Sequence, residues 1–166
     1  MVKAHEMTAN EKADILAWME PGGDLAFTGP IKSDEYLDPA DFAELVDLFK
    51  NEIPHRKTIN TNFTTYSIKH AMERHFKVWH PNRGHVYVSE QECVRILLAA
   101  GFCLIEARGT IGSMYHTNIG SKDLNSIGSK KEFEKARNEY MLEYYNKNGF
   151  GGIDLKQLRK LSKAAK

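Results

Sequence analysis

Residues 89–101 read S-E-Q-E-C-V-R-I-L-L-A-A-G, and this segment constrains the fold more than any other part of the chain. Ser89 and Glu92 have the spacing of a capping box at a helix start, and Gly101 suits the left-handed residue that ends a helix. The apolar residues between them point in almost every direction around a helix, so other elements have to surround it. We therefore expect residues 89–101 to form the central helix of the core.

Further helices are predicted from caps and apolar stripes. Thr8 and Glu11 form a second capping box, and Asp38-Pro39 is a typical helix start. The helix after Pro39 carries an apolar stripe at helical spacing, and Asp41, Glu44 and Asp47 then form an acidic outer surface. The predicted helices are residues 9–19, 39–49, 65–76, 130–146 and 155–165.

Two extended segments follow the central helix, and glycines at positions 109 and 112 lie between them. This pattern predicts a small β-hairpin at residues 102–119. We expect irregular connections at residues 53–62 and 120–128. The fold class is then α+β and mostly helical, with five to six helices around the central helix. Residues 1–128 form one globular domain, and residues 129–166 form a C-terminal helix-loop-helix docked on it.

The composition is that of an ordinary folded chain, with 27% charged residues in 166 residues, so neither a disulfide nor a metal is needed for folding. Cys93 and Cys103 lie in apolar runs and are expected to be buried thiols. The longest apolar run, residues 96–102, is far too short to span a membrane, and no signal peptide is evident. We expect a cytoplasmic protein without a membrane partner.

Charge is unevenly distributed along the chain. Residues 1–52 carry 12 acidic and 4 basic side chains, whereas residues 53–166 carry 10 acidic and 19 basic ones. The two parts could attract and cancel each other on folding. Alternatively, the basic side could face nucleic acid or an acidic protein. The sequence leaves both readings open.

A group of basic and aromatic residues supplies the candidate binding surface, because such a mixture suits phosphate contact and base stacking. Lys69 and Arg74 are expected to point outward from their helix. A helix-turn-helix is not indicated, because its helices are joined by three or four residues and here about twelve intervene. The candidate residues are His55, Arg56, Lys57, Tyr66, Lys69, Arg74, Lys77, Trp79 and Arg83.

Motifs for metals and catalysis are weak. Residues 146–157 resemble the calcium loop of the EF-hand family, but Asn146, Asn148, Phe150 and Gln157 stand where that loop needs acidic ligands. Histidines recur every five residues from His70 to His85, without a paired C-x-x-C or an H-E-x-x-H motif. No G-x-S-x-G elbow or phosphate-binding glycine loop occurs. We expect no catalytic residue, no metal and no cofactor.

Two blocks carry a family resemblance: I-N-T-N-F-T-T-Y-S-I-K-H at residues 59–70 and Y-V-S-E-Q-E-C-V-R-I-L-L-A-A-G-F at residues 87–102. They resemble a module of uncharacterised small proteins from phages, prophages and other mobile elements, in which a Y-S-x-K-H helix start precedes a Y-V-S-capped helix. The resemblance implies a phage-type accessory role and supplies no catalytic residue.

The sequence as a whole favours a non-enzymatic accessory protein that binds a host or phage protein. The contact would be a charged surface, either the acidic residues 34–47 or the basic residues 55–83, and an inhibitor of a host protein would fit this mode. The first alternative is a nucleic-acid-binding regulator that uses the basic and aromatic surface. A third class, an enzyme with an unfamiliar active site, stays open.

Overall fold

The computed structural model describes residues 1–18, 37–107 and 114–147. The chain divides into two compact units, residues 1–129 and residues 130–166. In the second unit the described part is one helix, α6 (Lys130–Lys147). The fold is α+β and mostly helical, as predicted, with six helices and three strands within the described ranges. None of these helices is long and apolar enough to cross a membrane.

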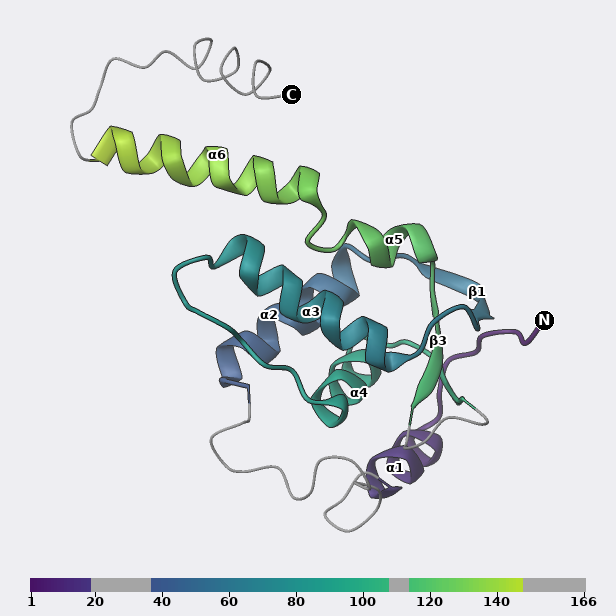
Figure 1. Cartoon of the computed structure of the whole chain (residues 1–166). Helices are drawn as coiled ribbons and strands as arrows, with labels where there is room; N and C mark the ends of the chain where they lie inside the picture. The colour runs from purple at the N-terminus through teal and green to yellow at the C-terminus, as the bar shows by residue number, and fades with distance from the viewer. Residues whose placement is uncertain (19–36, 108–113, 148–166) are drawn as a thin grey trace. The chain divides into compact units, whose positions relative to one another are not determined.

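The first unit contains all the other elements (Figure 1). In chain order they are α1 (Ala9–Trp18), α2 (Pro39–Asn51), β1 (His55–Asn60), α3 (Thr65–Trp79), α4 (Glu90–Ala99), β2 (Leu104–Glu106), β3 (Tyr115–Ile119) and α5 (Ser121–Ser126).

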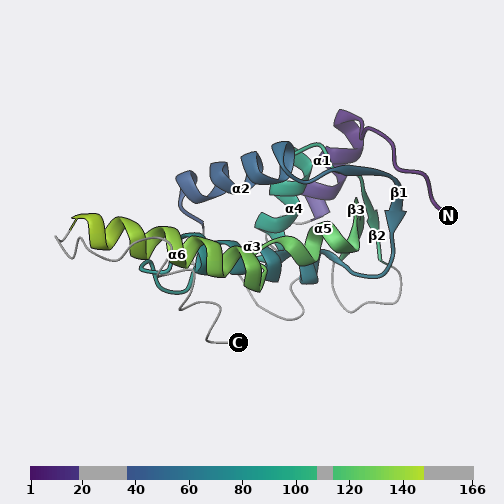
Figure 2. The same ribbon diagram turned by 90° about the horizontal axis from the view of Figure 1, so that it is seen from above.

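The helix α4 is the centre of the core, as predicted from its sequence. The Glu92 backbone N–H donates to Ser89 Oγ at 3.2 Å, and the Ser89 N–H donates back to the Glu92 carboxylate at 3.3 Å. At the other end Gly101 has a φ of 88°, and the Phe102 N–H bonds to the Leu97 carbonyl at 2.9 Å. This is a Schellman ending that needs the left-handed residue. Figure 2 shows α4 between α2 and α3.

Side chains from both flanking helices bury α4. From α2, Leu45 and Phe49 are fully buried, and Phe49 meets Phe102 edge-on with ring centres 6.1 Å apart. From α3, Ile68, Met72 and Phe76 have no exposed surface. Asp38 caps α2 by accepting the Ala40 N–H at 2.8 Å. The apolar stripes that predicted these helices therefore face the core, where burial supplies most of the folding free energy.

The sheet contains the predicted β2–β3 pair and one further strand. Its order is β1-β3-β2, and all pairings are antiparallel. The expectation of a connection without a strand at residues 53–62 was wrong, because residues 55–60 form β1. The sequence did not indicate this strand, since its first three residues are all exposed and lack the alternation of a half-buried strand. The Asn118 amide donates to the Arg56 carbonyl at 3.1 Å and accepts the Cys103 N–H at 2.9 Å. This side chain connects β1 to the residue before β2.

Two further features lie at the ends of the sheet. Residues 120–128, expected to be irregular, contain the six-residue helix α5, which is too short to show an apolar stripe. The N-terminal segment covers β1, because the Ala4 N–H bonds to the Lys57 carbonyl and the Ile59 N–H to the Val2 carbonyl, each at 2.9 Å. Most of the EF-hand-like loop and the helix expected at 155–165 lie outside the described residues.

Candidate functional site

The outer face of α3 and the segment after it enclose a hollow of about 490 Å³. Four of its lining residues lie on successive turns of α3, at the three- and four-residue spacing that gives one helix face. The hollow is lined by His70, Glu73, Arg74 and Lys77 from α3 and by Pro81, Gly84, His85 and Val86 after it.

Positive charge dominates this hollow. Arg74 and Lys77 are exposed, and neither forms an ion pair with any described residue. The Glu73 carboxylate also lines it, but Lys69 Nζ lies 3.4 Å from its Oε1 and His70 Nδ1 lies 2.8 Å from its Oε2. Two free cations therefore remain beside a carboxylate that already has a cationic partner.

Glu73 also holds the segment after α3 in place. Its Oε1 accepts the Val88 backbone N–H at 3.2 Å. Burial raises the pKa of Glu73, but the hydrogen bonds from His70 and Val88 and the Lys69 charge outweigh it, and the net pKa lies below the ordinary value. The carboxylate therefore stays ionised at neutral pH and ties one wall of the hollow to α3.

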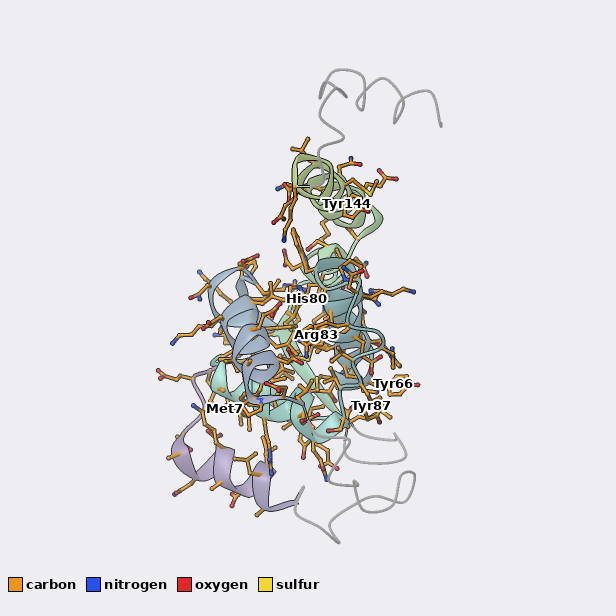
Figure 3. All side chains as sticks on the ribbon, turned by 90° about the vertical axis from the view of Figure 1, so that its left-hand side faces the viewer. Met7, Tyr66, His80, Arg83, Tyr87 and Tyr144 are labelled. Atoms are coloured by element: carbon orange, nitrogen blue, oxygen red, sulfur yellow. The ribbon has the colours of Figure 1, made fainter. Side chains whose placement is uncertain are left out.

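Beside the hollow lies a cluster of Lys69 with two tyrosines. Tyr66 is 49% exposed and Tyr87 is 41% exposed. The Lys69 ammonium lies over both rings, 5.2 Å from the Tyr66 centre and 5.0 Å from the Tyr87 centre. In Figure 3 the labels of Tyr66 and Tyr87 lie next to each other on one side of the first unit. The cluster therefore presents two aromatic rings to solvent, fixed around a cation.

The expectation that Lys69 points outward was wrong, because the residue is only 6% exposed. Such burial is tolerated because the ammonium has the Glu73 carboxylate and two aromatic faces as partners. Arg74, the other residue expected to point outward, is exposed. The sequence alone does not show which of Lys69 and Arg74 is buried, since both are basic residues on the same helix.

Behind the cluster lies a second carboxyl group, that of Glu90. Thr65 Oγ1 donates to Glu90 Oε1 and accepts the Tyr115 N–H at 3.1 Å. Glu90 Oε2 is buried and has no hydrogen-bond partner among the described residues. Burial raises the pKa of Glu90 to about 7, against the smaller lowering effects of the Thr65 hydrogen bond and the Lys69 charge.

The acidic surface predicted on α2 is partly neutralised from within the fold. Asp41 is 4% exposed rather than outward-facing, and its Oδ2 accepts a hydrogen bond from Arg83 at 2.8 Å. Glu44 Oε1 lies 2.7 Å from His75 Nε2 and 2.9 Å from His80 Nε2. Figure 3 shows His80 and Arg83 between α2 and α3. These residues join α2 to α3 and to the segment after it, so the carboxylates of Asp41 and Glu44 already have partners within the fold.

The nine sequence-predicted site residues therefore fall in separate places. Arg74 and Lys77 line the hollow, and Tyr66 and Lys69 lie beside it. Arg83 pairs with Asp41. The others lie apart from the hollow: Trp79 contacts His75 at the end of α3, and His55, Arg56 and Lys57 belong to β1, where His55 stacks on Phe102.

Sequence reasoning missed three residues of this region. His70 follows Tyr66 by one helical turn, with ring centres 4.6 Å apart, and this spacing was a signal that could have been used. His85 and Tyr87 precede α4 in a segment without regular structure, so no periodicity places them. Only the path of residues 80–89 brings them to α3.

A chain of Cys103, His5 and Glu11 has the order of a nucleophile, a base and a carboxylate. Cys103 Sγ lies 3.7 Å from His5 Nδ1, and His5 Nε2 lies 3.0 Å from Glu11 Oε1. Cys103 is only 1% exposed, however, and its N–H is bound by Asn118. A substrate carbonyl could neither reach the sulfur nor find that amide as an oxyanion donor. We therefore assign the three side chains of Cys103, His5 and Glu11 a structural role.

Both cysteines are buried free thiols, as predicted. Burial raises the pKa of the Cys93 thiol, so it stays protonated at neutral pH. Within the described ranges, no group of three or more His, Cys, Asp or Glu side chains is arranged to hold a metal ion. Comparison with protein families, curated proteins and solved structures finds no match to this chain.

Proposed function

We propose that this chain is a non-enzymatic binding protein whose ligand is a nucleic acid. The main support is the hollow on α3. There the cations of Arg74 and Lys77, which have no ion-pair partner in the described part of the chain, lie with the imidazoles of His70 and His85. Guanidinium and ammonium groups without protein partners are the groups that neutralise backbone phosphates and release their counterions. We call this surface, together with Tyr66 and Tyr87, the α3 face.

The acidic surface of α2 supports a binding role less well. Asp41 pairs with Arg83, and Glu44 is hydrogen-bonded to His75 and His80, so both carboxylates already have partners within the fold. The α3 face has the opposite property, because its two cations are exposed and have no ion-pair partner among the residues that the structure describes. Charge complementarity therefore favours an anionic ligand on α3.

A duplex-reading mode through α4 is also poorly supported. Ten residues separate Trp79 at the end of α3 from Glu90 at the start of α4, where a helix-turn-helix uses three or four. Most of α4 is buried in the core, with six of its ten residues buried. The recognition surface proposed here is accordingly α3 and not α4.

The resemblance of residues 59–102 to phage and mobile-element proteins fits a nucleic-acid-binding accessory protein, and that role remains part of the proposal. An acidic protein surface is the competing ligand, because it too would be drawn to Arg74 and Lys77. The two ligands differ in their response to salt and in the polymer that they prefer, so one binding experiment separates them.

The test is fluorescence anisotropy with a labelled mixed-sequence DNA strand between 50 and 200 mM salt, with poly-glutamate as competitor. We expect the Arg74→Ser/Lys77→Ser variant to reduce the slope of log affinity against log salt by about 1.4, since each single-strand phosphate contact contributes about 0.7. The control Lys50→Ser/Lys57→Ser removes the same charge from α2 and β1. The proposal would be overturned if both double variants reduced the salt slope equally, or if the wild type did not bind DNA. It would also be overturned if poly-glutamate displaced the labelled strand as effectively as unlabelled DNA does.

A further inference from the structure

The geometry points to a single-stranded nucleic acid as the ligand, with bases stacked on Tyr66 and Tyr87 and phosphates held by Arg74 and Lys77. This inference rests on the proposed function and adds to it the strandedness of the ligand and the residues that read its bases. It depends on three features of the α3 face: the exposure of the two rings, their fixed position, and their distance from the hollow.

The two rings are exposed without being loose. About half of Tyr66 and two-fifths of Tyr87 are open to solvent, with fractions of 49% and 41%. The Lys69 ammonium contacts both rings, at 5.2 and 5.0 Å, and the His70 ring lies 4.6 Å from the Tyr66 ring, edge to face. Lys69 is itself held by the Glu73 carboxylate at 3.4 Å. The rings are thus positioned before a ligand arrives, which reduces the entropy cost of binding.

An aromatic surface of this kind has a use for unpaired bases. Every base has a π-face, and stacking on an aromatic side chain is sequence-tolerant. In a duplex the bases are stacked on one another and only their edges reach the grooves, so a tyrosine ring meets no free base face. The Tyr66 and Tyr87 rings therefore favour a single strand over a duplex.

The rings and the cations are within reach of one short strand. Tyr66, His70, Arg74 and Lys77 lie on successive turns of the same face of α3. Tyr66 and Arg74 are eight residues apart, which is about 12 Å along a helix axis. Single-strand sites cover about four or more nucleotides, so one strand can contact both groups.

Trp79 provides a matched comparison on the same helix. It is also an exposed aromatic residue, but its ring lies 6.5 Å from His75, beside the Glu44 cluster and apart from the hollow. Its exposure alone would predict stacking as strongly as that of Tyr87. If stacking requires a position next to Arg74 and Lys77, Trp79 contributes nothing to the binding of the strand.

The experiment compares a fifteen-nucleotide single strand, the corresponding duplex and an abasic strand of the same length, each by anisotropy at low salt. The wild type should bind the single strand at least tenfold more tightly than the other two. Tyr66→Leu/Tyr87→Leu should lose about thirtyfold or more on the normal strand, from stacking worth about 1–3 kcal/mol per base, and much less on the abasic strand. Tyr66→Phe/Tyr87→Phe and Trp79→Leu should bind as the wild type does.

The outcomes separate this inference from the proposed function. Equal affinity for duplex and single strand, or equal loss in the Leu and Phe variants, would overturn the stacking inference. If Arg74→Ser/Lys77→Ser still abolished the salt-dependent binding in that case, nucleic-acid binding itself would stand. Absence of binding to all three probes would overturn both. Thermal unfolding of each variant shows whether a loss reflects binding or folding.

Discussion

The Lys69 ammonium lies 5.0 Å from the centre of the Tyr87 ring, although the two residues are 18 positions apart in the sequence. This contact links α3 to the segment that leads into α4. It also explains how a lysine with only 6% exposure is tolerated, since Glu73 and the Tyr66 ring complete its surroundings. Buried charge with partners on several sides has measurable consequences for stability.

Replacement of Lys69 by methionine should therefore destabilise the protein. The stem is kept, but Glu73 loses its ammonium partner and the two tyrosines lose their cation, so the free energy of unfolding should fall by about 1–3 kcal/mol. The matched control is Lys77→Met, which makes the same change at an exposed site of the same helix and should cost less than about 0.5 kcal/mol. Urea unfolding measures both. An equal loss of unfolding free energy in Lys69→Met and Lys77→Met would contradict the stabilising contacts of Lys69 with Glu73 and the two tyrosines.

Glu90 should make stability fall as pH rises. Its pKa is raised to about 7 from an ordinary value of 4.5, so the folded state binds the proton more tightly than the unfolded chain does. The favourable contribution is complete below about pH 4.5 and is lost as pH rises through about 7. Glu90→Gln should thus leave stability nearly unchanged at pH 5 and raise it relative to wild type at pH 8.5, by up to about 3 kcal/mol. A pH-independent difference between the two proteins would contradict this.

Glu44 should act in the opposite direction. Burial raises its pKa, but the hydrogen bonds from His80 and His75 outweigh this and hold the pKa below its ordinary value. Its contribution is present above about pH 4.5 and is lost as pH falls through the lowered pKa. Glu44→Gln should cost about 1 kcal/mol at pH 6 and almost nothing in strong acid. Chemical unfolding across this range, with Asp47→Asn on the same helix as control, tests the sign.

Gly128 should tolerate no side chain. It has a φ of 61°, and a Cβ there would lie 2.8 Å from Arg74 Cβ and 3.0 Å from the Arg74 backbone. Gly128→Ala should therefore combine a left-handed backbone cost of about 1–2 kcal/mol with a clash. Gly84→Ala is the control, because its φ of 76° carries the same backbone cost with nothing within 4 Å. Thermal unfolding should show a larger loss for Gly128→Ala; equal losses would contradict the contact with Arg74.

The sequence was most informative where one local pattern determined the outcome. The Ser89–Glu92 capping box and Gly101 placed α4, because both ends of that helix are fixed by residues near in sequence. Strand β1 escaped prediction, since its exposed start and its partner β3, about 60 residues away, leave no local pattern. Long-range pairing is what the periodicity of a single segment cannot show.

The same distinction applies to the candidate site. The basic residues of α3 were identified from the sequence, but their separation into buried Lys69 and exposed Arg74 depends on Tyr87, which reaches α3 only through tertiary folding. Asp41 likewise became buried because Arg83, 42 positions away, pairs with it. In both cases the partner that decides burial lies far away in the sequence, and no local pattern specifies it.

We propose that the exposed cations of Arg74 and Lys77 on α3 hold a nucleic acid. The most direct measurement is the affinity of the Arg74→Ser/Lys77→Ser variant for a fifteen-nucleotide strand at 50 mM salt, compared with the wild type and with Lys50→Ser/Lys57→Ser. We expect at least a tenfold loss confined to the α3 variant. The same affinity in all three proteins would contradict it.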